Sequence, residues 1–156
     1  KVIGKMTDNP RKIIIESITR MLSRREHAYH ELLRKLSQKG FAMDDCAPVV
    51  EEFKQAGIQS DARFAEMKVR SGVAKGQGPA RIKAECQQFA IDESLLEQAM
   101  QENDTDWFTL AGQVRRKRFG LTLPVTDKEK FKQIRFLQYR GFYSDHIQHA
   151  FDDDHE

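Results

Sequence analysis

The chain has 156 residues, of which 32% are charged and 39% are hydrophobic, and its net charge is only +2. This length suits one compact domain or a short array of repeats, and the high proportion of charge favours thin helical units over one thick core. No apolar run is long enough to cross a membrane and no signal peptide is visible, so we expect a cytoplasmic protein without a membrane partner. In that compartment Cys46 and Cys86 are expected to be reduced thiols, with a disulfide between them as the lesser alternative.

Apolar residues recur at helical spacing in nine segments, and we find no convincing alternating strand. The first helix is expected to begin at Asn9-Pro10, where a capping side chain precedes a proline. A capping box at residues 23–26 predicts the start of the second helix, and Asp45 is expected to cap the third. Similar start signals mark the six later helices: Ser60-Asp61, Gly78-Pro79, Asp92, Thr105 or Asp106, a second capping box at 126–129, and Ser144.

Three segments share a pattern in which an apolar residue precedes a helix ending. The matching positions are Leu36, Gly40 and Phe41; Cys86, Ala90 and Ile91; and Leu137, Gly141 and Phe142. The copies are spaced by about 50 residues, which is typical of a repeat architecture. Glycine supplies the left-handed conformation that closes a helix. Because alanine adopts this conformation poorly, we expect the second copy to end its helix in another way.

The sequence therefore predicts an all-α fold of three tandem three-helix repeats, each of about 50 residues, in an elongated array. We expect the repeats to span residues 11–59, 60–104 and 105–156. Residues 1–10 are expected to be a flexible N-terminal segment in which Met6 is the natural start and residues 1–5 derive from the expression vector.

The stretch 131–142 predicts the middle helix of a bundle. Phe131, Ile134 and Leu137 fall on one helical face, while Phe136 and Tyr139 form a second apolar strip. A helix that is apolar on two flanks packs against two neighbours. We therefore expect Phe131 and Tyr139 to belong to the core.

Charge changes sign in blocks along the chain. Residues 67–83 contain five basic and no acidic residues, 84–106 contain seven acidic and no basic residues, and 107–143 contain nine basic and two acidic residues. Repeats stacked in register would present a basic side and an acidic side. An equally good interpretation is that neighbouring helices pair opposite charges for solubility.

The sequence carries no recognisable catalytic or metal-binding motif. The glycines at 72–78 lack the Gly-Lys-Ser/Thr of a phosphate loop, and no strand precedes them. The pairs His27 and His30, and His146 and His149, have helical spacing but lack matching further ligands. No nucleophile, base and orienting acid occur at recognisable spacing. We therefore expect neither an enzyme nor a cofactor nor a metal site.

Basic residues beside aromatic residues recur, and such surfaces bind phosphate backbones or acidic protein surfaces. The candidate basic face comprises Arg24, Arg25, Arg34, Lys35, Lys68, Arg70, Lys75, Arg81, Lys83, Arg115, Arg116, Lys117, Arg118, Lys132, Arg135 and Arg140. We expect these side chains to be exposed and to contribute little to folding.

Four segments, in this order, resemble the RecX regulators of the bacterial RecA recombinase: LSRREHAYHELLRKL (22–36), SDARF (60–64), KGQGPARIKAE (75–85) and IRFLQYRGF (134–142). The resemblance covers nearly all of the chain from residue 11. It implies binding in the groove of the RecA filament, inhibition of its ATPase and strand exchange, and damping of the SOS response. It also implies a curved, elongated array, weaker binding to single- and double-stranded DNA, and no catalytic residues. The nine amphipathic helices, with one narrow core in each repeat, predict a monomer.

Three hypotheses remain open at this point. The chain is a regulator that binds a recombinase filament, a helical protein that acts on DNA directly, or a helical scaffold unrelated to nucleic acid.

Overall fold

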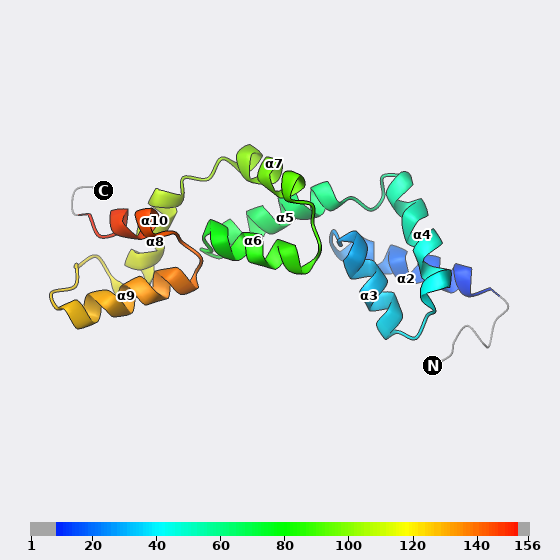
Figure 1. Cartoon of the computed structure of the whole chain (residues 1–156), viewed down its shortest axis with the longest axis horizontal. Coiled ribbons are helices and arrows are strands. Elements are labelled where there is room, and N and C mark those ends of the chain that lie inside the picture. The colour runs from blue at the N-terminus through cyan, green and yellow to red at the C-terminus, as the bar shows by residue number, and fades with distance from the viewer. Residues whose placement is uncertain (1–8, 153–156) are drawn as a thin grey trace.

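A computed structural model describes residues 9–152, which form nine α-helices and no strand (Figure 1). The helices are α2 (Pro10–Arg24), α3 (Tyr29–Gln38), α4 (Met43–Gln55), α5 (Asp61–Ala74), α6 (Pro79–Gln88), α7 (Glu93–Asn103), α8 (Trp107–Phe119), α9 (Asp127–Tyr139) and α10 (Ser144–His149). The expectations for residues 1–8 lie outside the described residues.

The helices fall into three sets of three that follow one another along the longest axis of the molecule. Figure 1 shows α2–α4 at one end, α5–α7 in the middle and α8–α10 at the other end. We call these sets repeat 1, repeat 2 and repeat 3. The predicted all-α, elongated array of three-helix repeats is therefore confirmed.

Each repeat buries its own apolar cluster. The core of repeat 1 contains Ile14, Ile18, Leu32, Leu36, Cys46, Val49 and Val50. The core of repeat 2 contains Phe64, Ala65, Val69, Ile82, Cys86, Ile91, Leu96 and Ala99, joined by Ala28 from repeat 1. The core of repeat 3 contains Ala111, Val114, Leu137, Phe142, Ile147 and Ala150. Full burial of one large aliphatic side chain contributes about 1.5–3 kcal/mol. Both cysteines are free thiols, and they lie in different cores, so the alternative of a disulfide is wrong.

Five of the predicted helix starts are confirmed by capping hydrogen bonds. In each, a side-chain oxygen accepts from a backbone N–H of the first turn. The capping residues are Asn9, Ser60, Asp92, Asp106 and Thr126.

The capping box expected at residues 23–26 is wrong. Ser23 lies in the last turn of α2, where its hydroxyl donates to the carbonyl of Arg20 at 2.7 Å. The next helix begins only at Tyr29, whose N–H donates to the Asp61 carboxylate at 2.9 Å. The predictions for Asp45 and Ser144 are also wrong, because both lie inside helices that begin at or before them.

The pattern shared by the three repeats ends α3, α6 and α9 in the same way. A backbone N–H just beyond each helix donates to the carbonyl five residues earlier, as in a Schellman motif. The three bonds are Phe41 to Leu36 at 3.2 Å, Ile91 to Cys86 at 3.3 Å and Phe142 to Leu137 at 3.1 Å. Ala90 adopts the left-handed conformation with φ +57°, so the expectation of a different ending in the second repeat is wrong.

Two aromatic residues of α9 do not belong to the core as expected. Phe131 is 57% exposed and Tyr139 is 72% exposed. Leu137 on the same helix is fully buried, so α9 packs mainly through one flank. The Tyr139 ring instead lies under the guanidinium of Arg81 from repeat 2, at 5.1 Å, as a cation–π contact.

Repeats 1 and 2 are joined at the start of α3 and the start of α5. The Asp61 carboxylate accepts from Tyr29, and the Gln59 side chain donates to the His27 carbonyl at 3.1 Å. Arg63 also pairs with Glu26 at 2.9 Å. These contacts fix how the second repeat follows the first.

Repeats 2 and 3 are joined by backbone groups at the start of α6 and the end of α9. The N–H of Gly78 donates to the Arg140 carbonyl at 2.7 Å, and the N–H of Ala80 donates to the Gly141 carbonyl at 2.9 Å. A Cβ atom on Gly78 would lie 2.5 Å from the Gly141 backbone. The close approach of two backbones therefore requires glycine here.

Candidate interaction surface

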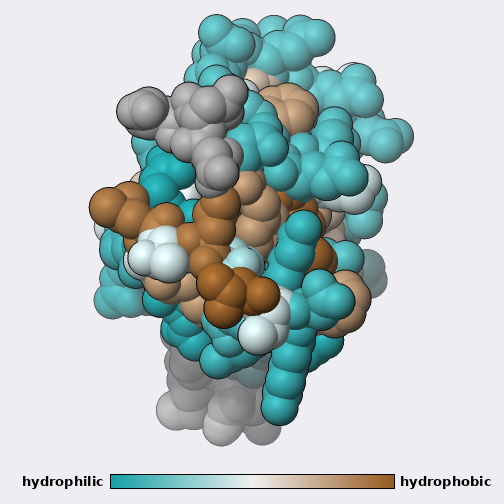
Figure 2. All heavy atoms as spheres, turned by 90° about the vertical axis from the view of Figure 1, so that its left-hand side faces the viewer, coloured by the Kyte–Doolittle hydropathy of each residue, from teal (hydrophilic) through white to brown (hydrophobic). Residues whose placement is uncertain are grey.

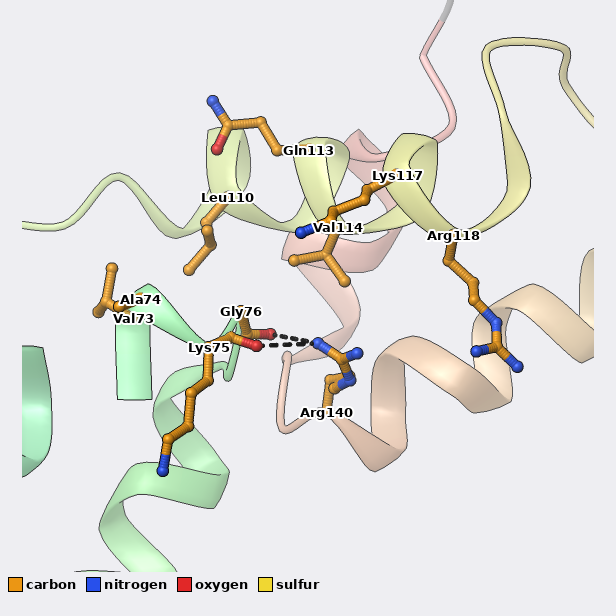
Figure 3. A pocket seen from close by; sticks show the side chains of 10 residues that line it. All are labelled: Val73, Ala74, Lys75, Gly76, Leu110, Gln113, Val114, Lys117, Arg118 and Arg140. Carbon is orange, nitrogen blue, oxygen red and sulfur yellow. Dashed lines mark hydrogen bonds between the residues drawn. The ribbon is translucent and has the colours of Figure 1, made fainter. Parts of the chain in front are cut away.

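A pocket of about 590 Å³ lies at the boundary between repeats 2 and 3 (Figure 3). It is lined by Val73, Ala74, Lys75, Gly76, Leu110, Gln113, Val114, Lys117, Arg118 and Arg140. Four of these side chains are cationic, and no described carboxylate lines the pocket. The boundary between repeats therefore concentrates positive charge in a concave site.

Arg140 is fixed in place by the junction. Its Nη1 donates to the carbonyls of Lys75 at 3.1 Å and Gly76 at 3.3 Å, as Figure 3 shows. Its guanidinium also lies 4.8 Å from the centre of the Phe136 ring, and that of Arg118 lies 5.0 Å from the same ring. Both guanidiniums thus contact the same aromatic side chain.

Lys75, Lys117 and Arg118 are exposed, and none of them forms an ion pair within residues 9–152. Lys117 and Arg118 come from the last turn of α8, and Lys75 follows the last residue of α5. Cations are favoured at helix C-termini, where the backbone dipole is negative. These side chains remain available to an anionic partner.

Arg115 does not belong to an exposed basic face, and that expectation is wrong. It is 2% exposed, and its guanidinium donates to the carbonyl of Ala150 at 2.9 Å and to Gln133 Oε1 at 3.2 Å. It also covers the Phe151 ring at 5.4 Å. Burial lowers the pKa of Arg115, although a guanidinium stays protonated at neutral pH. Arg115 therefore joins the helices of repeat 3.

Arg25 and Lys35 both form ion pairs with the buried carboxylate of Glu31. Glu31 lies 2.6 Å from Arg25 and 3.5 Å from Lys35, and it accepts from the N–H of Ala28 at 3.1 Å. Burial opposes ionisation of Glu31, but the hydrogen bonds from Arg25 and Ala28 outweigh burial and lower its pKa. These two cations stabilise the start of α3.

Lys68 and Arg81 likewise both form ion pairs with Glu85. The Lys68 ammonium lies 3.1 Å and the Arg81 guanidinium 3.5 Å from its carboxylate. Burial opposes ionisation of Glu85 as well, and these two cations lower its pKa. Their charge is thus partly compensated within repeat 2.

The remaining candidates lie outside the pocket lining. They are Arg24, Arg34, Arg70, Lys83, Arg116, Lys132 and Arg135. Arg34 covers the Phe89 ring at 5.6 Å and Lys83 covers the Tyr143 ring at 5.9 Å. The structure thus brings together Lys75, Lys117, Arg118 and Arg140.

Two apolar surfaces were not predicted from the sequence: the apolar wall of the pocket and an apolar patch at the end of repeat 3. Val73, Leu110 and Val114 line the pocket beside the cations. Leu121 is 80% and Val125 is 93% exposed in the loop before α9. Figure 2 views the molecule from the repeat 3 end and shows hydrophobic residues gathered within a hydrophilic surround. The uncharged run 119–126 was the available indication of the exposed patch.

Residues 9–152 contain no helix with the length and apolar character that a membrane span requires.

Comparison with known proteins identifies the same three units. The first, second and third three-helix domains of RecX match residues 16–53, 60–100 and 104–151. The chain is 37% identical over 135 residues to the regulatory protein RecX of Halorhodospira halophila, covering 86% of this chain and 84% of that protein. It is 40% identical over 135 residues to the regulatory protein RecX of Vibrio parahaemolyticus, covering 86% and 87% of the two chains.

The fold is also that of solved RecX structures. The crystal structure of RecX from Lactobacillus salivarius matches with a TM-score of 0.74 at 19% identity, covering 92% of this chain and 96% of that one. A second crystal structure of a regulatory protein RecX matches with a TM-score of 0.77 at 19% identity, covering 92% and 73%. Because three domain matches and relatives above 30% identity span most of its length, the chain belongs to the RecX family of regulatory proteins.

Proposed function

We propose that this protein binds the RecA nucleoprotein filament and modulates, mainly by inhibition, its ATPase, strand exchange and SOS-inducing activity. Membership of a family of regulatory proteins named RecX supports this function. Such a role belongs to DNA repair and recombination in the cytoplasm. It requires no catalysis by this chain, which acts as a monomer by binding to its partner.

The observation that carries the proposal is the concave basic site between repeats 2 and 3. An elongated array can follow the groove of a helical filament, because successive repeats contact successive parts of the partner. A filament groove offers acidic protein surface and DNA phosphate together. The cations at Lys75, Lys117, Arg118 and Arg140 are arranged to meet such a surface.

Direct action on DNA is a second candidate function, supported by the same pocket. Against it stands the modest net charge of +2, with seven acidic residues concentrated in 84–106. Sequence-independent binding to duplex DNA depends on many phosphate contacts and falls steeply with salt. We therefore expect bare DNA to bind more weakly than the filament at physiological salt.

Co-sedimentation with RecA filaments on single-stranded DNA, compared with bare DNA, tests the proposal. The wild-type chain is expected to sediment with the filament at salt concentrations that release it from bare DNA. The double variant Lys117→Glu and Arg118→Glu is expected to lose most of this binding. Lys12→Glu with Arg20→Glu, an equal charge change at exposed positions of α2, is the control and is expected to bind normally.

Two results would contradict the proposal. Equal retention of the wild type by filament and bare DNA across the salt range would favour direct action on DNA. Absence of wild-type binding to the filament at low salt would remove the recombinase as its partner.

A further inference from the structure

The pocket between repeats 2 and 3 is apolar at one end and cationic at the other. Leu110, Val114 and Lys117 follow one another at i, i+4 and i+7 on α8, so one face of this helix lines the pocket from its apolar to its charged end (Figure 3). Val73 adds apolar surface from repeat 2, and Arg118 adds charge in the last turn of α8. A ligand that fits this pocket carries an apolar group and negative charge in a fixed order.

We propose that this pocket binds an extended, acidic segment of a protein. An apolar side chain of the segment lies against Leu110 and Val114. Its carboxylates pair with Lys117, Arg118 and Arg140. This inference deepens the proposed function and rests on it, because it assigns the segment to the recombinase subunits of the filament.

The aliphatic character of the apolar wall favours a protein side chain over a nucleotide base. Bases bind to single-strand-binding proteins mainly by stacking on aromatic rings. None of the described residues that line the pocket is aromatic, and its wall is formed by side chains such as Leu110 and Val114. Phe136 is not among the lining residues, and the guanidiniums of Arg118 and Arg140 lie over its ring. The wall therefore suits a leucine, isoleucine or valine side chain.

Arg140 is positioned to bind a carboxylate. Its Nη1 donates to the carbonyls of Lys75 and Gly76 at 3.1 and 3.3 Å, which restrains the guanidinium. Within residues 9–152 its Nε and Nη2 make no hydrogen bond. The N–H groups of these two nitrogens lie on one edge of the guanidinium and donate in parallel, which is how arginine binds both oxygens of a carboxylate.

Uncompensated charge favours acidic residues in the segment. Lys117 and Arg118 form no ion pair within residues 9–152, and no described carboxylate lines the pocket. Complementary charge of this kind speeds association and fixes how the two partners align. The acidic residues therefore set the direction in which the segment lies along α8.

The length of the lined face sets the length of the segment. Leu110 and Lys117 are seven residues apart on α8, a rise of roughly 10 Å at about 1.5 Å per residue. An extended chain advances about 3.3 Å per residue, so about three residues separate the apolar side chain from the carboxylates. The pocket volume of about 590 Å³ lies in the range of sites that hold small ligands, which fits a short segment.

Fluorescence anisotropy with a labelled peptide tests this site on the whole chain. The probe places a leucine three residues before two adjacent aspartates, among glycines and serines. The wild-type chain is expected to bind it. Two matched peptides, one with serine for the leucine and one with asparagines for the aspartates, are each expected to bind at least about tenfold more weakly.

Variants of the chain place the peptide in the pocket. Lys117→Ala with Arg118→Ala is expected to bind the probe at least about tenfold more weakly. Lys12→Ala with Arg20→Ala removes the same two residue types from exposed positions of α2 and is expected to leave the affinity unchanged. An excess of the probe should also displace the wild type from RecA filaments in co-sedimentation, whereas the asparagine peptide should not.

Several outcomes would overturn the assignment. No binding of the probe by the wild type, or equal affinity for the asparagine peptide, would exclude an acidic segment, and equal affinity for the serine peptide would reject the role of the apolar wall. Wild-type binding to filaments would leave the proposed function standing in each case. Oligothymidylate bound more tightly than the probe, and lost in the pocket variant, would assign the pocket to DNA. Binding of the probe without binding to filaments would retain the ligand and reject the recombinase as its source.

Discussion

Arg115 connects three elements of repeat 3 through one side chain. It extends from α8, donates to the Ala150 carbonyl beyond α10 and donates to Gln133 of α9. Because Arg115 is only 2% exposed, water cannot replace these contacts without opening the repeat. Its position in the basic run 115–118 concealed this role, since four adjacent cations resemble a solvated surface.

Replacing Arg115 by Ala is therefore expected to destabilise the protein by about 2–4 kcal/mol, because two buried acceptors lose their donor and the side chain no longer fills its site. Lys117→Ala, two residues further on the same helix, is an exposed control that should change the stability by no more than about 0.5 kcal/mol. Urea unfolding measures both. Equal midpoints for the two variants would show that Arg115 is not structural.

A second buried polar site lies around His27. Its Nδ1 is 3.1 Å from the Arg25 carbonyl and its Nε2 is 3.1 Å from the Lys35 ammonium. A neutral imidazole fits this site by donating from Nδ1 and accepting at Nε2. Burial lowers the pKa of His27, and it does the same to His146 in repeat 3. Both lie below the ordinary value of about 6.5.

These shifts predict that acidification destabilises the fold. A histidine whose folded pKa is depressed contributes stability above its unfolded pKa, and this stability is lost as pH falls through the folded pKa. The unfolding midpoint in urea should therefore decrease as pH falls from 7 to 5.5, where Glu31, with its lowered pKa, remains ionised. His27→Gln should reduce this pH dependence, whereas the exposed control His30→Gln should not. A midpoint independent of pH over this interval would contradict the assignment.

Ala90 stores backbone strain at the end of α6. Its φ of +57° is a left-handed conformation that costs an alanine about 1–2 kcal/mol, whereas the equivalent positions in the other repeats are Gly40 and Gly141. Ala90→Gly is thus expected to raise the stability by about 0.5–1 kcal/mol, part of the gain being offset by the entropy of glycine in the unfolded chain. Thermal unfolding tests this, and a lower midpoint for the variant would show that the ending of α6 is not strained.

At the scale of helices, one serine and one threonine, each at the start of a predicted capping box, behave differently. Thr126 accepts from the N–H of Glu129 at 3.1 Å and caps α9, while Ser23 lies within the last turn of α2. Thr126→Ala is expected to cost about 1 kcal/mol and Ser23→Ala no more than about 0.5 kcal/mol. Comparable losses for the two variants in urea unfolding would indicate that Ser23 does cap a helix.

This contrast explains which elements could be predicted from the sequence. Caps such as Thr126 act within one turn, so local pattern identified them, and apolar spacing identified all nine helices of the described chain. The start of α3 was not predicted correctly, because the N–H of Tyr29 donates to the carboxylate of Asp61, 32 residues further along the chain. Local patterns do not indicate such partners.

The same reasoning applies to the candidate site. Composition identified the basic residues, but it could not separate the buried Arg115 from the pocket residue Arg118. Nor could it show that Arg140 reaches Lys75 and Gly76 across the junction, 65 and 64 residues away in the sequence. The segments that resemble the RecX family contribute to both junctions through residues such as Asp61 and Gly78.

At the scale of the whole molecule, three small cores and two junctions between repeats produce an elongated array (Figure 1). An array of this kind presents much surface for its length, and its shape depends on how each repeat follows the preceding one. The junction between repeats 2 and 3 both fixes that geometry and forms the basic pocket. Structure and proposed binding therefore depend on the same contacts.

The rate of ATP hydrolysis by RecA filaments on single-stranded DNA, titrated with the wild-type chain, tests the central claim most directly. The proposed function predicts a saturable decrease in the rate, with a much weaker effect of the variant Lys117→Glu and Arg118→Glu at the same concentrations. The control Lys12→Glu with Arg20→Glu should inhibit as the wild type does. A hydrolysis rate unaffected by the folded wild-type chain, at concentrations where it sediments with the filament, would contradict regulation of the recombinase ATPase.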